Sequence, residues 1–216
     1  MPTTKADHIV LTAPDLATGI AHIESALGVS LSPRRGGEHA GHGTHNALLN
    51  LGDDFYLEIL AINPAAPVPS HPRLFGLSSA DLSGVRVHHW IARSDDVHAA
   101  AEAAKAAGFD VGSPKPMARG DLHWHLTLRD DGGLAADGAF PSLIQWGVTH
   151  PHPVAPGLPD VGARLVRLEI RHPRAEELKK AFVAAGLDDA RVVVSDAAGP
   201  VLSAVISTPT GEHTLS

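Results

Sequence analysis

The feature that most constrains the fold is an internal repeat. A strand pattern, a helix pattern and further strand patterns follow one another in residues 5–63, and the same order returns in residues 84–149. A strand followed by a helix and then by antiparallel strands predicts an α+β fold rather than a doubly wound one. We therefore expect residues 1–150 to form paired β-α-β-β-β modules around a cleft. Residues 160–216 predict a third half-module, a C-terminal β-α-β-β extension.

Turn and capping residues separate the expected elements. Asp15 begins and Gly28 ends the first helix pattern, as helix caps do. The Pro-rich stretches 64–72 and 151–159 separate the three copies. Residues 33–43 are rich in Gly, Arg and His, and we expect them to form a loop.

Polar residues recur at matching points of the repeat. Aligning the first two copies without a gap gives His8 and His89 equivalent positions in the repeat. Both are expected on the strand face turned away from the helices. The last strands of the two copies carry Glu58 and Gln145, each inside an apolar run. A half-buried carboxylate needs a partner, a proton or a metal. If the copies pack pseudo-symmetrically, these four side chains converge.

Composition narrows the classes of function. The chain has 15 His and no Cys among 216 residues, which excludes disulfides and Cys nucleophiles and fits a cytoplasmic protein. The net charge is −7 and no basic block occurs, so we expect no nucleic-acid partner. No apolar run approaches the roughly 20 residues that span a bilayer, so we expect no membrane partner. The N-terminus lacks a signal-peptide layout.

Three motifs carry a resemblance to a known family. These are Gly43–Leu49 (GTHNALL), Tyr56–Ile59 (YLEI) and Leu143–Gly147 (LIQWG). With the paired modules, they resemble the bacterial glyoxalase-like domain group of the vicinal oxygen chelate (VOC) superfamily. That superfamily includes glyoxalase I, extradiol dioxygenases and bleomycin-resistance proteins. The resemblance covers roughly residues 5–150.

The resemblance implies a metal-binding enzyme. By position, His8, Glu58, His89 and Gln145 would hold a divalent metal, either Fe, Ni, Zn, Mn or Co. The implied activity is that of a lyase, an isomerase or an extradiol-type dioxygenase acting on vicinal oxygens of a small-molecule substrate. Gln145 cannot abstract a proton, which departs from glyoxalase I. The alternative is a metal-free protein that sequesters a small molecule, as bleomycin-resistance proteins do. The sequence does not fix the oligomeric state, and the dimers common among relatives make a homodimer one assembly that the resemblance implies.

Further candidates surround the expected cleft. Besides Glu58, we expect His45 and His125 to act in catalysis as proton carriers. His45 follows a Gly-Thr pair at a strand start, where a structural cap is the alternative. His123 and His125 share one strand face, and the alternative is a solvated outer face.

Other residues are expected to contact the substrate. These are His123, Trp124, Trp146 and Arg35. Both Trp side chains have a core position as their alternative. Arg35 belongs to the expected loop, which would either recognise an anionic substrate as a lid or stay solvated. The third copy shows no His–carboxylate pairing, so we expect it to cover an open edge or to form a subunit contact.

Overall fold

The computed structural model describes residues 1–31, 36–78, 82–148 and 151–216. The first copy contains β1 (Thr4–Thr12), α1 (Leu16–Leu27), β2 (Gly36–His39), β3 (Thr44–Asn50), β4 (Tyr56–Ile62) and the 3₁₀ turn η1 (Leu74–Gly76). The second contains β5 (Arg86–Ser94), α2 (Val97–Ala106), β6 (Ser113–Arg119), β7 (Leu122–Leu128), η3 (Ala135–Gly138) and β8 (Ser142–Trp146). The third copy comes after the 3₁₀ turn η4 (Ala155–Gly157). It contains β9 (Arg164–Arg171), α3 (Ala175–Ala184), β10 (Val192–Ser195), β11 (Val201–Thr208) and β12 (Gly211–Leu215).

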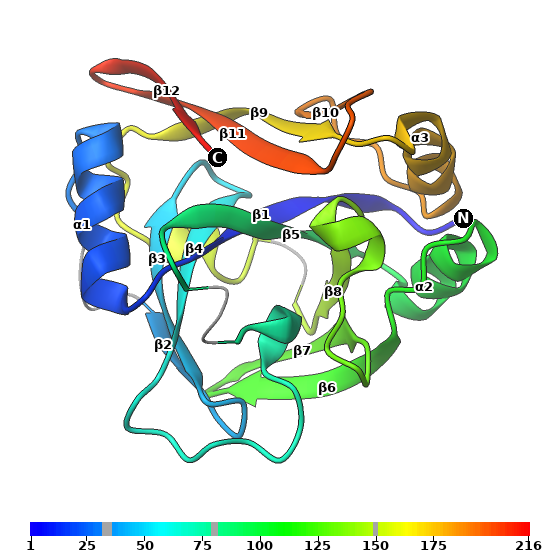
Figure 1. The fold of residues 1–216 in the computed structure, drawn as a ribbon, viewed down its shortest axis with the longest axis horizontal. Coiled ribbons are helices and arrows are strands. Elements are labelled where there is room, and N and C mark those ends of the chain that lie inside the picture. The colour runs from blue at the N-terminus through cyan, green and yellow to red at the C-terminus, as the bar shows by residue number, and fades with distance from the viewer. Residues whose placement is uncertain (32–35, 79–81, 149–150) are drawn as a thin grey trace.

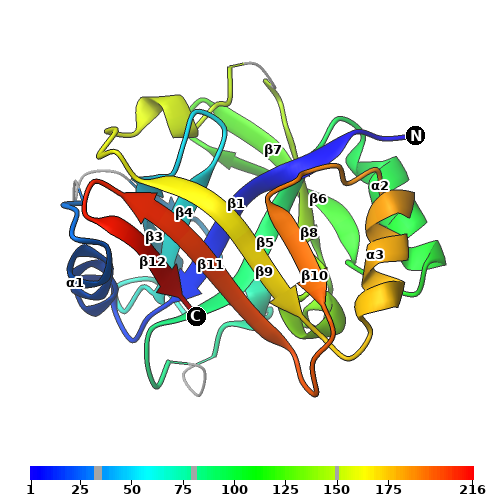
Figure 2. The same ribbon diagram turned by 90° about the horizontal axis from the view of Figure 1, so that it is seen from above.

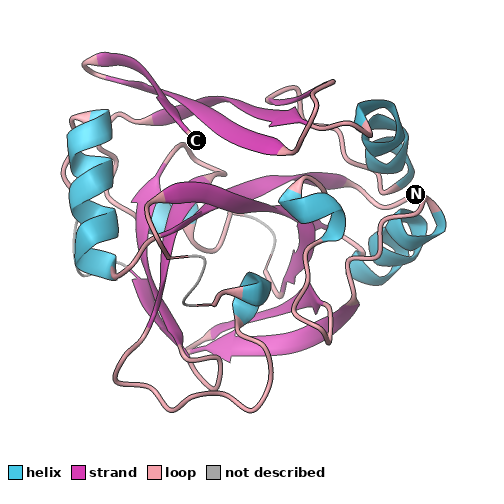
Figure 3. Ribbon diagram, viewed as in Figure 1, coloured by secondary structure: helices cyan, strands magenta, loops and turns pink. Residues whose placement is uncertain are grey.

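The first two copies share one curled sheet. Its strand order is β2-β3-β4-β1-β5-β8-β7-β6, and the copies join through the antiparallel pair β1–β5. The sheet closes into a barrel-like shape (Figure 1), and Arg119 at the end of β6 reaches Asn46 on β3. Figure 3 shows the α-helices outside this sheet and the η1 turn across one open end. This is the α+β architecture of paired modules that the repeat predicts.

Local sequence explains how the helices begin and end. The Asp15 carboxylate accepts the Thr18 backbone N–H at the start of α1, and Gly28 ends the helix at φ 63°. The buried face of α1 includes Gly19, where a Cβ atom would lie 2.5 Å from Cγ2 of Ile59. Glycine therefore lets α1 pack closely on β4. Asp96 caps α2 in the same way by accepting the Ala99 N–H.

The two faces of the curled sheet have separate cores. Ile9 and Trp90 belong to the outer core, which lies under the helices and the second sheet. Val10 and Ile91 belong to the inner core, together with Trp124 and other side chains that fill the barrel. Alternation along β1 and β5 thus sends every second residue inward, so the inner face of the barrel is where a site can be built.

The third copy forms a four-stranded sheet of order β10-β9-β11-β12. It lies across the outer face of β1 and β5, as Figure 2 shows from above. Polar contacts also join it to the barrel. Asp54 accepts from Arg93 Nη2 at 2.9 Å and from Arg191 Nη1 at 3.1 Å, and Arg191 also pairs with Asp189.

Two strands differ from the sequence expectation. β2 lies within the stretch that we expected to be a loop, and it pairs with β3. β6 carries Pro114 and Pro116, which disfavour a central strand, but β6 is at the sheet edge, where a missing N–H is tolerated. Within the described ranges, no helix has the length and apolarity needed to cross a membrane.

Candidate functional site

A β-bulge in β1 creates the first contact of the site. Asp7 and His8 are sequence neighbours in a strand, yet the His8 Nδ1–H donates to Asp7 Oδ1 at 2.6 Å. The pairing of β1 with β5 shifts between Ala6 and His8, which leaves Asp7 as the extra residue. A bulge re-aims a side chain that alternation would send to the other face.

Asp7 is a fully buried hydrogen-bond acceptor. Besides His8, it accepts from Trp146 Nε1 at 3.0 Å and from His152 Nε2 at 2.9 Å. His152 Nδ1 in turn accepts backbone N–H groups, so its ring proton lies on Nε2. Burial alone would raise the pKa of Asp7, but the hydrogen bonds and charges of His152 and His8 hold it well below its usual range. Asp7 is thus an ionised anchor for His8.

Glu58 on β4 lies on the far side of His8. Its Oε2 is 3.5 Å from His8 Nε2, its Oε1 is 3.6 Å from His39 Nε2, and Oε1 accepts from Asn46 Nδ2 at 2.7 Å. Burial raises the pKa of Glu58, but the His8 hydrogen bond, the nearby imidazoles and the Asn46 amide together lower it to about 2. Glu58 is therefore a buried, ionised carboxylate that lies between two imidazoles.

The two imidazoles beside Glu58 are pushed in opposite directions. Burial lowers the pKa of His8, but its hydrogen bonds with Asp7 and Glu58 more than offset this and raise the pKa above 6.5. Burial and the charge of Arg119 lower the pKa of His39 below 6.5, against the opposing effect of Glu58. Of the two imidazoles, His8 therefore holds its proton more strongly than His39 does.

Hydrogen bonds also fix the tautomer of His39. Asn46 Oδ1 accepts the Gly37 N–H at 2.8 Å, which sets the orientation of the amide. Asn46 Nδ2 then donates to His39 Nε2 at 3.2 Å, and His39 Nδ1 lies 2.9 Å from Thr44 Oγ1. The hydrogen of the neutral ring lies on Nδ1. The lone pair is on Nε2, which faces the cavity.

These groups line a small cavity inside the barrel. Its volume is about 40 Å³, enough for a few water molecules. Arg119 supplies a cation at its rim, 3.5 Å from Asn46 Oδ1. Apolar walls come from Leu48, Tyr56, Leu74, Phe75, Met117, Trp124, Leu126, Ile144 and Trp146. A hydrogen-bonded acid–base cluster thus lies at one end of an apolar chamber.

The four expected metal ligands do not form one set. His89 lies on the inner face, but its Nδ1–H donates to Gly138 O at 3.3 Å and its Nε2 accepts the Ser142 N–H at 3.0 Å. Gln145 lies on the outer face, where its Oε1 accepts the Val97 N–H at the start of α2. Among the described residues, no group of three or more His, Cys, Asp or Glu side chains is arranged to hold a metal ion.

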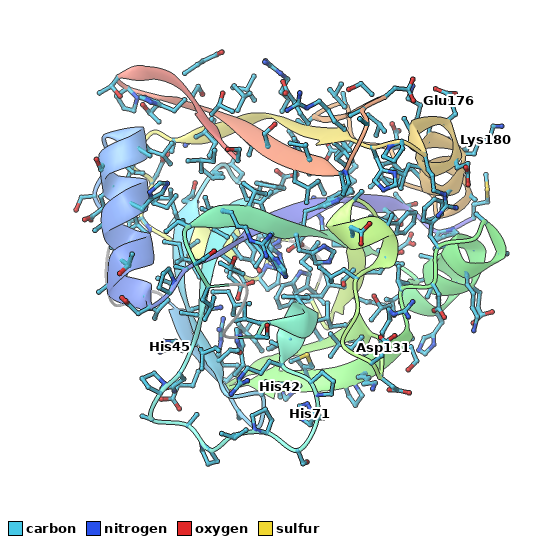
Figure 4. The ribbon with its side chains drawn as sticks, in the orientation of Figure 1. His42, His45, His71, Asp131, Glu176 and Lys180 are labelled. Atoms are coloured by element: carbon cyan, nitrogen blue, oxygen red, sulfur yellow. The ribbon has the colours of Figure 1, made fainter. Side chains whose placement is uncertain are left out.

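The remaining candidates divide between the two faces. Trp124 and Trp146 line the cavity, whereas His123 and His125 are exposed on the outer face of β7. His45 lies opposite Glu38 in the β2–β3 strand register and faces outward. Its neighbour Asn46 faces Glu58. In Figure 4, His45 lies well apart from His42 and His71. Arg35 lies outside the residues that the structure describes.

Sequence reasoning missed several members of the cluster. These are Asp7, His39, Asn46, Arg119 and His152. The hairpin signal Ala40–Gly43, between residues that alternate in polarity, would have placed His39 and Asn46 on one face. Nothing in the sequence signals the bulge at Asp7. Without the bulge, the alternation of side chains along β1 predicts that Asp7 faces away from His8.

Comparison with known proteins identifies a family and a fold. The sequence model of the family described as "Glyoxalase-like domain" matches residues 6–186. A hypothetical protein from Staphylococcus aureus has a TM-score of 0.62 at 12% identity, with 91% of this chain and 87% of that chain covered. At this identity the likeness is one of fold.

Shorter structures also align. Methylmalonyl-CoA epimerase in complex with methylmalonyl-CoA and NH4+ has a TM-score of 0.46 at 20% identity, covering 68% of this chain and 96% of that one. The Mycobacterium tuberculosis methylmalonyl-CoA epimerase has a TM-score of 0.46 at 16% identity, covering 67% and 89%. No curated protein matches the sequence.

Proposed function

Since this chain belongs to the glyoxalase-like domain family of the VOC superfamily, we propose that it is a small-molecule enzyme of the lyase or isomerase class. In this proposal it moves a proton on a substrate that carries vicinal oxygens. The proton moves at the carbon next to a carbonyl group, within the cavity around Glu58.

One observation carries the proposal. His8 and His39 flank the same carboxylate, and their pKa values are shifted in opposite directions from 6.5. A pair of titratable groups pushed apart in this way is the usual arrangement of an acid and a base that work at one pH. Both rings line the same cavity, so the carbonyl end of a small substrate placed there would meet both.

Each group then has a distinct role. His39 Nε2, whose lone pair accepts the Asn46 amide in this structure, exchanges that hydrogen bond for the substrate and accepts the proton from the substrate carbon. His8, whose raised pKa favours its protonated form and which Asp7 holds in place, donates a hydrogen bond to the oxygen that becomes negative. Glu58 stabilises both imidazoles when they are charged, and its low pKa of about 2 keeps it from competing for the proton. Arg119 balances the charge of an enediolate-like intermediate at the rim of the cavity.

The superfamily resemblance also implies a divalent metal, which would polarise the substrate oxygens. The four residues that the resemblance implies as ligands do not fit a metal ion in this structure. Both ring nitrogens of His8 face carboxylates, both ring nitrogens of His89 are hydrogen-bonded, and Gln145 lies on the other face of the sheet. We therefore derive no step through a metal, and the proton transfer rests on the side chains alone.

A solvent-exchange experiment tests the proposal. Wild-type protein in D₂O is incubated with a panel of 2-hydroxy- and 2-oxo-carbonyl compounds, and NMR detects deuterium at the carbon next to the carbonyl. We expect incorporation into at least one compound, reduced at least about a hundredfold in His39→Gln, as for loss of a general base. His22→Gln serves as the matched control, because His22 is exposed on α1.

The same experiment separates the enzyme from a binding protein. A protein that only sequesters small molecules would shift ligand resonances without any exchange. Exchange that is equal in wild type and His39→Gln would assign the base to another group and overturn the roles given above. Circular dichroism and thermal unfolding of each variant show that it is folded before exchange is compared.

A further inference from the structure

A second, larger cavity lies beside the cavity around Glu58. We propose that it binds an organic anion, with an apolar body and one carboxylate or phosphate group, through Arg73 and His42. This goes beyond the proposed proton transfer, because it concerns a different set of side chains and a binding property that is measured without turnover.

The size and walls of the cavity suit such a ligand. Its volume is about 370 Å³, within the range of small-molecule sites. It lies between the segment that contains η1 and the paired strands β6 and β7. Apolar side chains form much of the lining, namely Leu74, Phe75, Val111, Leu128, Leu134 and Phe140. An apolar ligand body would be buried against these walls.

Two residues that line this cavity each have a buried nitrogen atom without a hydrogen-bond partner in the described part of the chain. These atoms are Nε of Arg73 and Nδ1 of His42. A buried donor without a partner is destabilising, so a ligand that satisfies it gains affinity. The two groups come from neighbouring segments, since a Cβ atom on Gly43 would lie 3.4 Å from Arg73 Nε. An oxyanion is the acceptor that suits the guanidinium of Arg73, and His42 adds a second donor in the tautomer that carries its hydrogen on Nδ1.

The other cations of the lining already have carboxylate partners. Lys115 Nζ pairs with Asp130, and Arg129 pairs with Asp131 at 2.6 Å. In the described residues, no carboxylate forms an ion pair with Arg73. Among the described residues, the one positive charge of the lining without a carboxylate partner is therefore that of Arg73.

Basic side chains also surround His42. Burial lowers its pKa first, and the charges of His71, His39 and Lys115 lower it further. The His42 and His71 rings are 4.9 Å apart, and Figure 4 shows them beside each other at the end of the barrel that η1 crosses. A neutral His42 still donates one N–H, whereas an anion in the cavity would ease its protonation.

The two cavities are neighbours but do not share polar groups. Leu74 and Phe75 line both, so this pair forms the wall between them. Neither Glu58 nor His39 lines the larger cavity. Anion binding is therefore expected to be unchanged in Glu58→Gln, which keeps a failure of this inference distinguishable from a failure of the proposed reaction.

Binding of matched probes provides the test. Titration calorimetry compares phenylacetate, its neutral amide phenylacetamide, phenyl phosphate and inorganic phosphate. We expect at least one phenyl anion to bind at least about tenfold more tightly than the amide, as a charged hydrogen bond predicts. Comparing phenylacetate with phenyl phosphate identifies the preferred anionic group, and inorganic phosphate alone shows what the apolar body contributes.

Variants locate the site. Arg73→Gln should weaken binding of the anion at least about tenfold and leave the amide unaffected, whereas Arg73→Lys should restore part of the affinity. Arg171→Gln is the matched control, an exposed Arg on β9. Equal binding of anion and amide by wild type, or equal anion binding by Arg73→Gln and wild type, would overturn the inference. The first comparison needs no variant and stands even if Arg73→Gln does not fold.

Discussion

Ser142 occupies the position on β8 that Glu58 occupies on β4. Val10 of β1 pairs with Glu58, and Ile91 of β5, its counterpart in the repeat, pairs with Ser142. The contacts match as well. His8 Nε2 is 3.5 Å from Glu58, and His89 Nε2 is 3.0 Å from Ser142 Oγ. One half of the barrel therefore has a carboxylate at this position and the other a hydroxyl.

This difference changes the charge of the paired histidines. His8, between two carboxylates, has a raised pKa. His89 has none beside it, and burial together with the charge of nearby His88 lowers its pKa to about 3. The second half of the barrel thus keeps the geometry of the repeat but holds a neutral imidazole. The acid–base chemistry that we propose is confined to the first half.

Replacing Ser142 should cost little. In Ser142→Ala, His89 Nε2 keeps the backbone N–H of residue 142, so we expect a loss of about 1 kcal/mol in the free energy of unfolding. Urea denaturation measures it. Deuterium exchange into substrate should equal that of wild type, and a loss of exchange comparable to that of His39→Gln would show that the second half takes part in the reaction.

Removing the carboxylate of Asp7 should change the titration of His8. In Asp7→Asn we expect a lower pKa for His8, followed by NMR of the imidazole nitrogens, and a loss of about 3 kcal/mol in stability, because a buried ion pair loses one partner. Since the folded pKa of His8 is raised, His8 stabilises the wild type below pH 6.5 and loses this effect as pH rises through the folded pKa. Asp196→Asn, at an exposed site, should change neither measurement.

Ionisation of Glu58 makes the free energy of unfolding vary with pH in the acid range. Its pKa falls from 4.5 in the unfolded chain to about 2 in the folded protein, so its contribution is present above pH 4.5 and is lost as pH falls toward 2. At 1.36 kcal/mol per pKa unit this is roughly 3 kcal/mol. Urea unfolding at a series of pH values should show a shallower acid slope in Glu58→Gln than in wild type. Parallel slopes would mean that Glu58 is not ionised in the way described.

Packing of α1 on β4 should be sensitive to one methyl group. In Gly19→Ala the new Cβ would lie 2.5 Å from Ile59 Cγ2 and 2.8 Å from Ala13 Cβ. We expect a net loss of about 1 kcal/mol or more, since overpacking costs about 1–3 kcal/mol and exceeds the gain in helix propensity. Thermal unfolding measures it. Gly84→Ala, where a Cβ atom meets nothing within 4 Å, is the control.

The sequence predicted the architecture well because the repeat and its caps are local signals. The helix α1 begins after Asp15 and ends at Gly28 as expected, and alternation correctly placed Val10 and Ile91 on the inner face. Alternation fails where a strand is apolar on both faces. β8 is such a strand, with Leu143 in the outer core and Ile144 in the inner one, so nothing in the pattern shows that Gln145 faces outward.

The candidate site could be predicted only in part. Glu58 and His8 were found because a polar residue in an apolar strand is conspicuous. His39 and Asn46 depend on a four-residue edge strand that contains two glycines, which weakens any strand pattern. Arg119 reaches Asn46 only because the curled sheet brings β6 near β3, and this closure is a property of the whole sheet rather than of any segment.

The C-terminal sheet has a consequence for assembly. It already covers the outer surface of β1 and β5, and Asp54 and Arg191 fasten it there. A second copy of the chain therefore cannot dock on that surface. Any symmetric pair has to use another part of the exterior, and the cavity around Glu58 is lined by side chains of a single polypeptide.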